Sequence, residues 1–114
     1  MIEQCAFGSM AINQQTYKSD LMILPDGRVV GNWRREAGHR LTYTDIADLV
    51  ACDPDIIVAG TGIYGLMRLE RDLVETLAAQ GIELVSARTK AAAKEFNRLI
   101  QTAQKVAACF HLTC

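Results

Sequence analysis

The glycine-rich segment after an apolar run is the first place where this sequence could bind a ligand. Residues 56–59 form the apolar run, and residues 60–65 follow at once with the spacing GxGxxG. In dinucleotide-binding folds such glycines let the backbone approach a pyrophosphate at the N-terminus of the next helix. Here the next helical segment begins only near Glu70, and no acidic residue ends the strand over residues 82–86. The nucleotide-binding motif is therefore incomplete.

Two interpretations of this loop stay open. Because the carboxyl ends of parallel strands meet at one edge of a sheet, Gly60, Thr61 and Gly62 should lie beside Arg88 and Thr89, where they could cradle a small anionic ligand or a nucleotide. Alternatively, the glycines serve only a turn with positive φ angles, which glycine adopts at little cost.

A second segment gathers an aromatic side chain and several cations. It contains Trp33, Arg34, Arg35, His39 and Arg40, and the tryptophan is the only one in the chain. Arginine binds carboxylates and phosphates, and tryptophan offers a stacking surface. Both residue types are also enriched at the energetic centres of protein interfaces. We expect this segment to contact a protein partner; recognition of an anion and a purely structural loop are the alternatives.

The C-terminus carries Cys109, His111 and Cys114, which are soft metal ligands. Their spacing fits none of the common zinc patterns, so we expect an apolar tail packed against the sheet and no metal or other cofactor. A catalytic thiol would need a histidine beside it, and the sequence has no local signature of such a pair. We therefore expect no catalytic residues and no enzymatic activity.

Length and charge narrow the function classes. The 114 residues suffice for a single domain over residues 1–114. With 12 basic and 13 acidic groups the net charge is −1, which gives no overall field to attract nucleic acid. No apolar run reaches the length of a membrane span, and the start lacks the pattern of a targeting leader. These features predict a cytoplasmic protein with free thiols, no nucleic-acid partner and no membrane insertion.

The elements that must position these residues divide the chain into two halves. The first half reads as short antiparallel strands at 2–7, 10–12, 21–24 and 28–30, with Pro25-Asp26-Gly27 predicting a tight turn. The second half alternates helix and strand. We expect helices from Thr44 to Ala51 and over residues 70–80, strands over 55–59 and 82–86, and a last helix capped by Thr89.

Two details sharpen this prediction. Gly81 stands where a left-handed glycine ends a helix. The last helix carries an apolar stripe that runs from Ala92 to Phe110.

Strand, crossover helix and strand make a right-handed βαβ unit. The fold class is α/β, with a short parallel βαβ core extended by antiparallel N-terminal strands.

Several short motifs together resemble a known family. They include Ser19-Asp20-Leu21, Pro25-Asp26-Gly27-Arg28-Val29, Asn32-Trp33-Arg34-Arg35 and His111-Leu112-Thr113-Cys114. The combination is similar to a small domain of unknown function whose eukaryotic relatives include the third mitochondrial NADH dehydrogenase (complex I) assembly factor and the adipogenesis-associated domain-containing protein. The resemblance implies a compact three-layer α/β fold, no established enzymatic activity and, in the mitochondrial relatives, a role as an assembly chaperone.

Two functions from different classes follow. The favoured one is a non-catalytic interaction or assembly-factor-like protein that meets a partner through the segment around Trp33. The alternative is a small-ligand or nucleotide-binding protein, or a minor enzyme, that uses the loop at Gly60-Thr61-Gly62.

Overall fold

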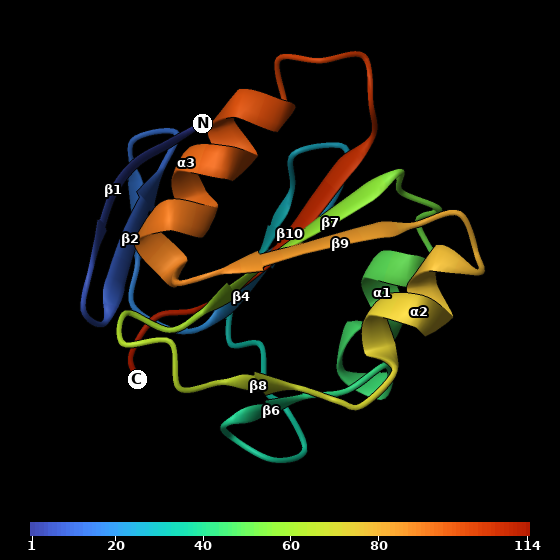
Figure 1. The fold of residues 1–114 in the computed structure, drawn as a ribbon. Helices are drawn as coiled ribbons and strands as arrows, with labels where there is room; N and C mark the ends of the chain where they lie inside the picture. The colour runs from blue at the N-terminus through green and yellow to red at the C-terminus, as the bar shows by residue number, and fades with distance from the viewer.

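A five-stranded mixed sheet forms the centre of the computed structural model, which describes all residues 1–114 (Figure 1). Its order is β5-β4-β10-β7-β9, with β4 at Leu21–Ile23, β5 at Val29–Val30, β7 at Ile56–Thr61, β9 at Glu83–Ala87 and β10 at Val106–His111. The strands β9, β7 and β10 are parallel, whereas β4 runs antiparallel to β10 and β5 antiparallel to β4. The predicted parallel core with antiparallel N-terminal extensions is confirmed.

The remaining strands form two smaller sheets. The N-terminal β1 (Ile2–Ala6), β2 (Ser9–Ile12) and β3 (Gln15–Tyr17) make an antiparallel sheet of their own. The two-residue strands β6 (Arg40–Leu41) and β8 (Arg68–Leu69) pair in parallel. Of these strands, β1 and β2 match the strands predicted at 2–7 and 10–12, whereas β3, β6 and β8 have no counterpart in the prediction.

Helices cover both faces of the central sheet, which gives the molecule its layers (Figure 1). On one face α3 (Thr89–Leu99) packs between the sheet and β1, where Asn97 exchanges two hydrogen bonds of 2.8 Å with the backbone of Ile2. On the other face lie the 3-10 turn η1 (Thr44–Ile46), α1 (Ala47–Val50) and α2 (Leu73–Ala78).

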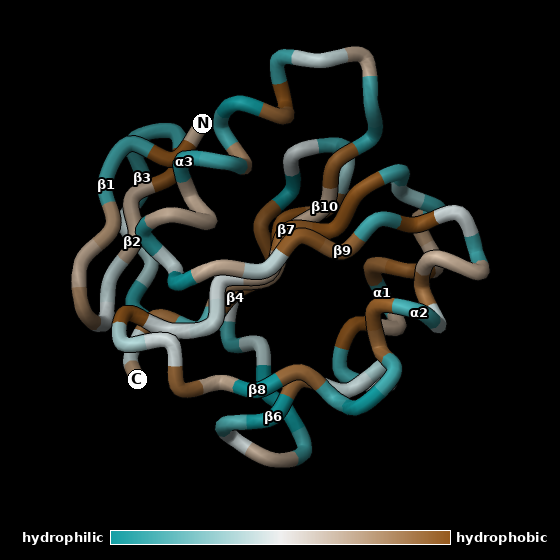
Figure 2. Tube along the Cα trace, viewed as in Figure 1, coloured by the Kyte–Doolittle hydropathy of each residue, from teal (hydrophilic) through white to brown (hydrophobic).

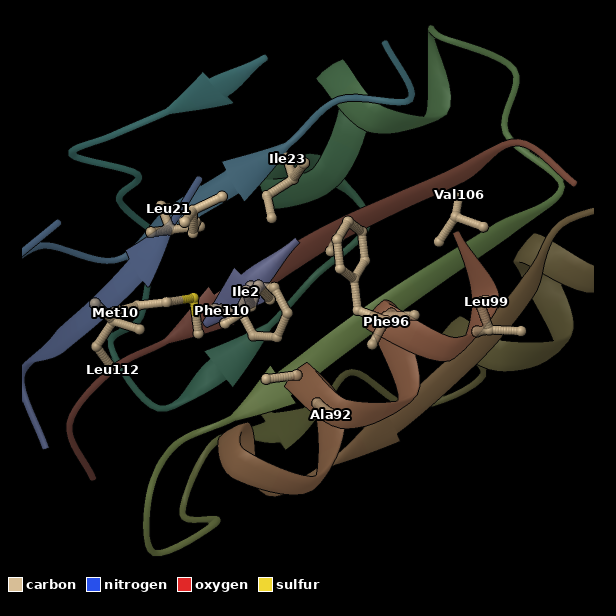
Figure 3. Packing of buried hydrophobic residues seen from close by; sticks show 14 of the residues in the cluster. Ile2, Met10, Leu21, Ile23, Ala92, Phe96, Leu99, Val106, Phe110 and Leu112 are labelled. Atoms are coloured by element: carbon tan, nitrogen blue, oxygen red, sulfur yellow. The ribbon is translucent and has the colours of Figure 1, made fainter. Parts of the chain in front are cut away.

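The alternation of side chains along β7 and β10 divides the interior into two cores. Ile56, Val58, Ala108 and Phe110 face α3, and the ring of Phe110 meets that of Phe96 edge to face with centroids 6.2 Å apart (Figure 3). The intervening residues face α1 and α2. Figure 2 shows the hydrophobic residues gathered along β7, β9 and β10. This double-sided burial is typical of strands in the interior of a parallel sheet.

The end of the chain differs from the prediction of one long helix. Helix α3 stops at Leu99, and residues 106–111 form β10, the central strand that pairs with both β7 and β4. Every residue of β10 is buried, so the segment shows no alternation and reads like a buried helix face. Periodicity alone cannot separate these two cases. The expectation of a C-terminal tail lying against the sheet is corrected in the same way, since residues 109–111 belong to β10 and only residues 112–114 follow the strand.

The two predicted N-terminal caps, Thr44 and Thr89, are wrong. The cap of α3 is Arg88, and neither Arg88 nor Tyr43, which precedes η1, makes a side-chain capping bond. Thr89 is instead the first residue of α3, and its hydroxyl donates to the carbonyl of His111 at 2.6 Å. The long-range bond wins because Thr89 lies buried beside the end of β10. Gly81 does have the predicted positive φ, at 79°, after α2.

Candidate functional site

Asp20, Arg35 and His111 form a buried polar cluster at the end of β10, on the side of the sheet that faces α1 and α2. Oδ2 of Asp20 lies 2.9 Å from Nη2 of Arg35 and 2.8 Å from Nδ1 of His111. Nη2 of Arg35 lies 3.1 Å from the same imidazole nitrogen. The side chains of Arg35 and His111 are only 5% and 7% exposed. The side chain of Asp20 is 17% exposed, so the cluster is a largely buried ion pair that reaches the surface at Asp20, with an imidazole attached to it.

Backbone contacts hold each member in place. Asp20 precedes β4, and its Oδ1 accepts a hydrogen bond of 2.8 Å from the N–H of Leu112, which follows β10. The guanidinium of Arg35 donates through Nε and Nη2 to the carbonyl of Gly38, at 3.0 and 2.8 Å. It also lies over the indole of Trp33, 4.7 Å from the ring centroid. The cluster thus joins β4, β10 and the segment that follows β5.

The hydrogen bonds of the cluster control the charge on Asp20. Burial acts to raise the pKa of the Asp20 carboxyl, but the bonds from Leu112, His111 and Arg35 outweigh burial and hold the pKa below its ordinary value. Asp20 is therefore ionised at neutral pH and balances the buried charge of Arg35. Breaking such a pair leaves one charge without compensation, which is the costly outcome for a buried ion pair.

The pair of Asp20 and His111 has the form of a carboxylate that orients an imidazole. If Nδ1–H of His111 donates to Asp20, the lone pair of the neutral ring lies on Nε2, and this nitrogen is buried without a hydrogen-bond partner. A general base must come within hydrogen-bond reach of its substrate. In this structure Nε2 of His111 is shielded from solvent, and the contacts of His111 with Asp20 and Arg35 lie inside the fold.

The segment around Trp33 does not form the exposed partner surface that its composition suggests. Trp33 is 7% exposed and belongs to the core beneath α1 and α2, where its Nε1–H donates to the carbonyl of Asp45 at 3.0 Å. Arg35 is buried beside it. Only Arg34, His39 and Arg40 are exposed. The expectation is corrected because the tryptophan gains more from burial than from lying in solvent.

An open hollow of ≈ 330 Å³ remains over this segment. The Asp20–Arg35 ion pair forms part of its wall, and the lining residues are Ser19, Asp20, Asn32, Trp33, Arg34, Arg35 and Gly38. His39 lies apart from the hollow, with its ring centroid 5.7 Å from that of His111, and Arg40 lies 4.0 Å from Glu70. Arg34 and Arg35 therefore both border the hollow, whereas His39 and Arg40 lie elsewhere.

Other segments of the chain occupy the space around the glycine loop at Gly60-Thr61-Gly62. The N–H of Gly62 donates to Oγ1 of Thr89 at 2.9 Å, and the N–H of Thr89 donates to the carbonyl of Gly62 at 3.0 Å. A Cβ on Gly60 would lie 2.6 Å from Cδ1 of Phe110, and one on Gly62 would overlap the carbonyl group of Cys114. These glycines therefore allow close packing, and the amide that an anion would need is already bonded.

Arg88, which is also predicted to hold the ligand, does not complete an anion site at this loop. Arg88 is exposed and extends along Gly65, where a Cβ would meet its Cγ at 3.0 Å. Gly62 and Gly65 have φ angles of 108° and 71°, so this loop contains the positive φ values that the second interpretation predicts. The geometry favours the structural role of the glycines.

The four cysteines are free thiols. Burial raises the pKa of Cys109 to about 12, so its thiol stays protonated and unreactive at neutral pH. Burial also raises the pKa of Cys5. No group of three or more His, Cys, Asp or Glu side chains is arranged to hold a metal ion, and His111 is already bonded to Asp20.

An exposed aromatic pair is the surface feature that sequence reasoning missed. Phe7 and Tyr64 are 54% and 59% exposed, and their ring centroids lie 5.7 Å apart. Leu66, two residues after Tyr64, is 49% exposed. The pair joins the β1–β2 turn to the glycine loop. Nothing in the sequence signals the pair, because these two turns come together only when both are bonded to the C-terminal segment.

Comparison with known proteins gives a family and a fold. A family model described as "Protein of unknown function (DUF498/DUF598)" matches residues 2–111. The chain is similar to the structure of a conserved hypothetical protein from Pyrococcus horikoshii OT3, with 26% identity, a TM-score of 0.83 and coverage of 100% of this chain and 99% of that one. The protein MT938 has 26% identity, a TM-score of 0.84 and coverage of 100% and 98%.

The chain is also similar to the crystal structure of an outer membrane protein from Bartonella henselae, with 23% identity, a TM-score of 0.79 and coverage of 99% of this chain and 94% of that one. At this identity the likeness concerns the fold alone. In the present chain, no helix has the length and apolar character required to cross a membrane.

Proposed function

We propose that this chain, which belongs to the DUF498/DUF598 family of proteins of unknown function, is a non-catalytic interaction module that binds a protein partner through Phe7 and Tyr64. The observation that carries the proposal is the exposure of these two rings side by side. Large aromatic side chains are enriched where protein interfaces gain most of their binding energy. This surface replaces the buried Trp33 as the candidate contact.

The backbone around the aromatic pair favours a binding role. The N–H of Gly8 donates to the carbonyl of Leu112 at 2.8 Å, and the N–H of Ile63 donates to the carbonyl of Thr113 at 2.6 Å. Both turns are therefore anchored to the same C-terminal segment. Rings that are already held in position lose less conformational freedom on binding, which leaves more of the contact energy for affinity.

The charge beside the rings indicates the chemistry of the partner. The exposed Arg88 extends along Gly65, which lies between Tyr64 and Leu66 in the sequence, so a cation lies at the turn that carries Tyr64. A fitting partner offers an apolar pocket with a carboxylate at its rim. The resemblance to the complex I assembly factor makes binding to a subunit or a second factor during assembly the specific role that we propose. A cytoplasmic location remains a prediction from the composition.

The chemistry of the buried groups supports a role without catalysis. The imidazole of His111 is shielded from solvent, and the Cys109 thiol is protonated. The alternative of a small anionic ligand at Gly60-Thr61-Gly62 is less favoured, because the Gly62 amide is bonded to Thr89 within the chain.

The test is affinity capture from the native organism with cross-linking and quantitative mass spectrometry. We compare wild type with the double variant Phe7→Ala with Tyr64→Ala. The control is Ile100→Ala, which removes another exposed apolar side chain at the end of α3. The double variant should keep its melting temperature and lose a partner that both wild type and the control retain. A folded double variant that captures every wild-type partner would refute the proposal.

A further inference from the structure

A polar hollow beside the buried ion pair has the dimensions of a small ligand site. The hollow of ≈ 330 Å³ lies where the pair of Asp20 and Arg35 reaches the surface, and Trp33 is the one apolar residue in its lining. Pockets that bind small molecules begin at about 300 Å³. Since a water molecule takes up about 30 Å³, the hollow has room for a ligand of roughly ten non-hydrogen atoms. Its size and lining therefore fit a small polar molecule.

The guanidinium of Arg35 has one nitrogen left for a ligand. Nε and Nη2 donate to the carbonyl of Gly38, and Nη2 also contacts Oδ2 of Asp20. Nη1 has no hydrogen-bond partner, although the side chain of Arg35 is only 5% exposed and lines the hollow. A buried donor without an acceptor is unfavourable. Arg35 therefore has unused N–H groups that an anion could accept.

Arg34 supplies a second cation on the exposed part of the lining. It takes part in none of the ion pairs of the chain. Its planar fork of N–H groups is therefore free, and such a fork matches the two oxygens of a carboxylate. Nη1 of Arg35 lies below the surface, so direct contact with it requires neighbouring side chains to shift, as side chains commonly do on binding.

The charge of the lining selects the class of anion. The carboxylate of Asp20 is engaged inside the fold, where Oδ1 accepts the N–H of Leu112 and Oδ2 contacts Arg35 and His111. With two arginines and this one aspartate, the lining carries a net charge of +1 on a chain whose net charge is −1. A phosphate group, with a charge of about −2 at neutral pH, would bring one uncompensated negative charge beside Asp20. A carboxylate, which has a single charge, balances the lining.

Two neutral side chains add hydrogen-bonding groups to the lining. Oγ of Ser19 accepts the N–H of Asn32 at 2.9 Å, and the hydroxyl hydrogen of Ser19 has no acceptor within the chain. The side-chain amide of Asn32 is exposed and makes no hydrogen bond within the chain. A hydroxyl and an amide can both bond to the polar groups of a ligand. They suit an acid that carries a hydroxyl group near its carboxylate.

We propose that this hollow binds the carboxylate group of a small organic acid through Arg34 and Arg35, with Ser19 and Asn32 bonded to the ligand's other polar groups. The site shares no residue with the aromatic pair Phe7–Tyr64, so the inference goes beyond the proposed function.

Titration of the full chain with mandelate, followed by ¹H–¹⁵N NMR, tests the proposal. Mandelate is a monoanion of the expected size with a hydroxyl group beside its carboxylate. It should shift the signals of Ser19, Asn32 and the Nε–H of Arg35 in a saturable way, with a Kd of about 1 mM or below. Mandelamide has nearly the same shape without the charge and should cause no saturable shift of these signals.

Substitution of two exposed arginines locates the site. Arg34→Gln removes a charged fork from the hollow and should weaken mandelate binding by at least about tenfold. The matched control Arg71→Gln removes the same charge from an exposed arginine outside the hollow and should bind mandelate like wild type. Thermal melting establishes that both variants are folded.

Four results would overturn the proposal. They are the absence of saturable shifts at the hollow, equal shifts with mandelamide, an unchanged affinity in Arg34→Gln, and tighter binding of inorganic phosphate than of mandelate. N-acetylaspartic acid α-amide carries the carboxylate of a protein side chain, and tighter binding of this compound than of mandelate would reject the small acid in favour of a protein side chain. The double variant Phe7→Ala with Tyr64→Ala should bind mandelate like wild type, so failure of the proposed function is distinguishable from failure of this inference.

Discussion

Oδ2 of Asp20 lies 2.8 Å from Nδ1 of His111, so a residue near the start of the chain is bonded to one near its end. The same carboxylate oxygen contacts Arg35, and its other oxygen accepts the N–H of Leu112. Through this single carboxylate the start of β4, the end of β10 and the segment after β5 are held together. Arg35, which the sequence analysis assigns to a partner surface, is instead paired with Asp20 inside the fold.

We expect Asp20→Asn to lower the free energy of unfolding by about 3–5 kcal/mol, because the variant leaves the charge of Arg35 buried without compensation. Urea denaturation measures this change. The control is Asp26→Asn, which breaks an ion pair with Arg28 of similar length, 2.8 Å, between exposed side chains. Exposed pairs contribute little, so the control should unfold at nearly the wild-type urea concentration. Equal losses in both variants would contradict the role of the cluster.

The stability contributed by Asp20 should depend on pH with a definite sign. The pKa of Asp20 in the folded protein lies below its ordinary value, so the unfolded state binds the proton more readily. This stability is present above the unfolded pKa of about 4 and is lost as the pH falls toward the folded pKa. The difference in unfolding free energy between wild type and Asp20→Asn should therefore shrink between about pH 5 and pH 2. A difference that stays constant over this range would argue against an ionised Asp20.

Trp33 should behave as a core residue. Trp33→Ala removes a buried indole from the core beneath α1 and α2 and should lower the free energy of unfolding by about 3–5 kcal/mol. Trp33→Phe keeps an aromatic ring and loses the hydrogen bond from Nε1 to the carbonyl of Asp45, so it should cost less. Guanidinium denaturation followed by far-ultraviolet circular dichroism gives both values. A Trp33→Ala variant as stable as wild type would contradict the burial.

The glycines of the loop differ in what a methyl group would meet, which allows a paired test. At Gly60 a Cβ would lie 2.6 Å from Phe110 and 2.9 Å from Oγ1 of Thr89, and the φ angle is not positive, so Gly60→Ala tests packing alone. Overpacking of this kind costs about 1–3 kcal/mol. Gly38 has no atom within 4 Å of that position, so Gly38→Ala should leave the thermal melting temperature nearly unchanged. If Gly60→Ala melts at the wild-type temperature, the close packing is refuted.

Cys109 should be protected from alkylation in the folded protein. Its pKa is raised to about 12 by burial, so it has almost no thiolate at pH 8. In a variant with Cys5, Cys52 and Cys114 changed to serine, iodoacetamide should label Cys109 only after unfolding. A variant that retains Cys52 alone, which is partly exposed, provides the comparison. Labelling of native Cys109 at the rate of Cys52 would contradict this expectation.

Local patterns in the sequence are enough to predict the alternation of helices and strands in the second half and the α/β class of the fold. Residues 56–59 and 82–86 carry continuous or alternating apolar side chains between polar turns. Gly81 has a positive φ angle, which few residues other than glycine adopt at little cost. These are local properties of the chain, and so β7, α2 and β9 could be placed before any contact was known. The antiparallel turn at Pro25-Asp26-Gly27 follows from the same local chemistry.

The positions of the polar and aromatic side chains of the candidate sites depend on the packing of distant segments. The run of residues 106–111 is buried on both faces, so its pattern fits a helix and a central strand equally, and pairing with β7 and β4 resolves it. That pairing places His111 beside Asp20. Arg35 is bonded to Asp20 and lies over Trp33 in the interior. It also lets the end of the chain fill the glycine loop and anchor Phe7 beside Tyr64. Contacts between residues so distant in sequence depend on the packing of the whole sheet, and no local pattern encodes them.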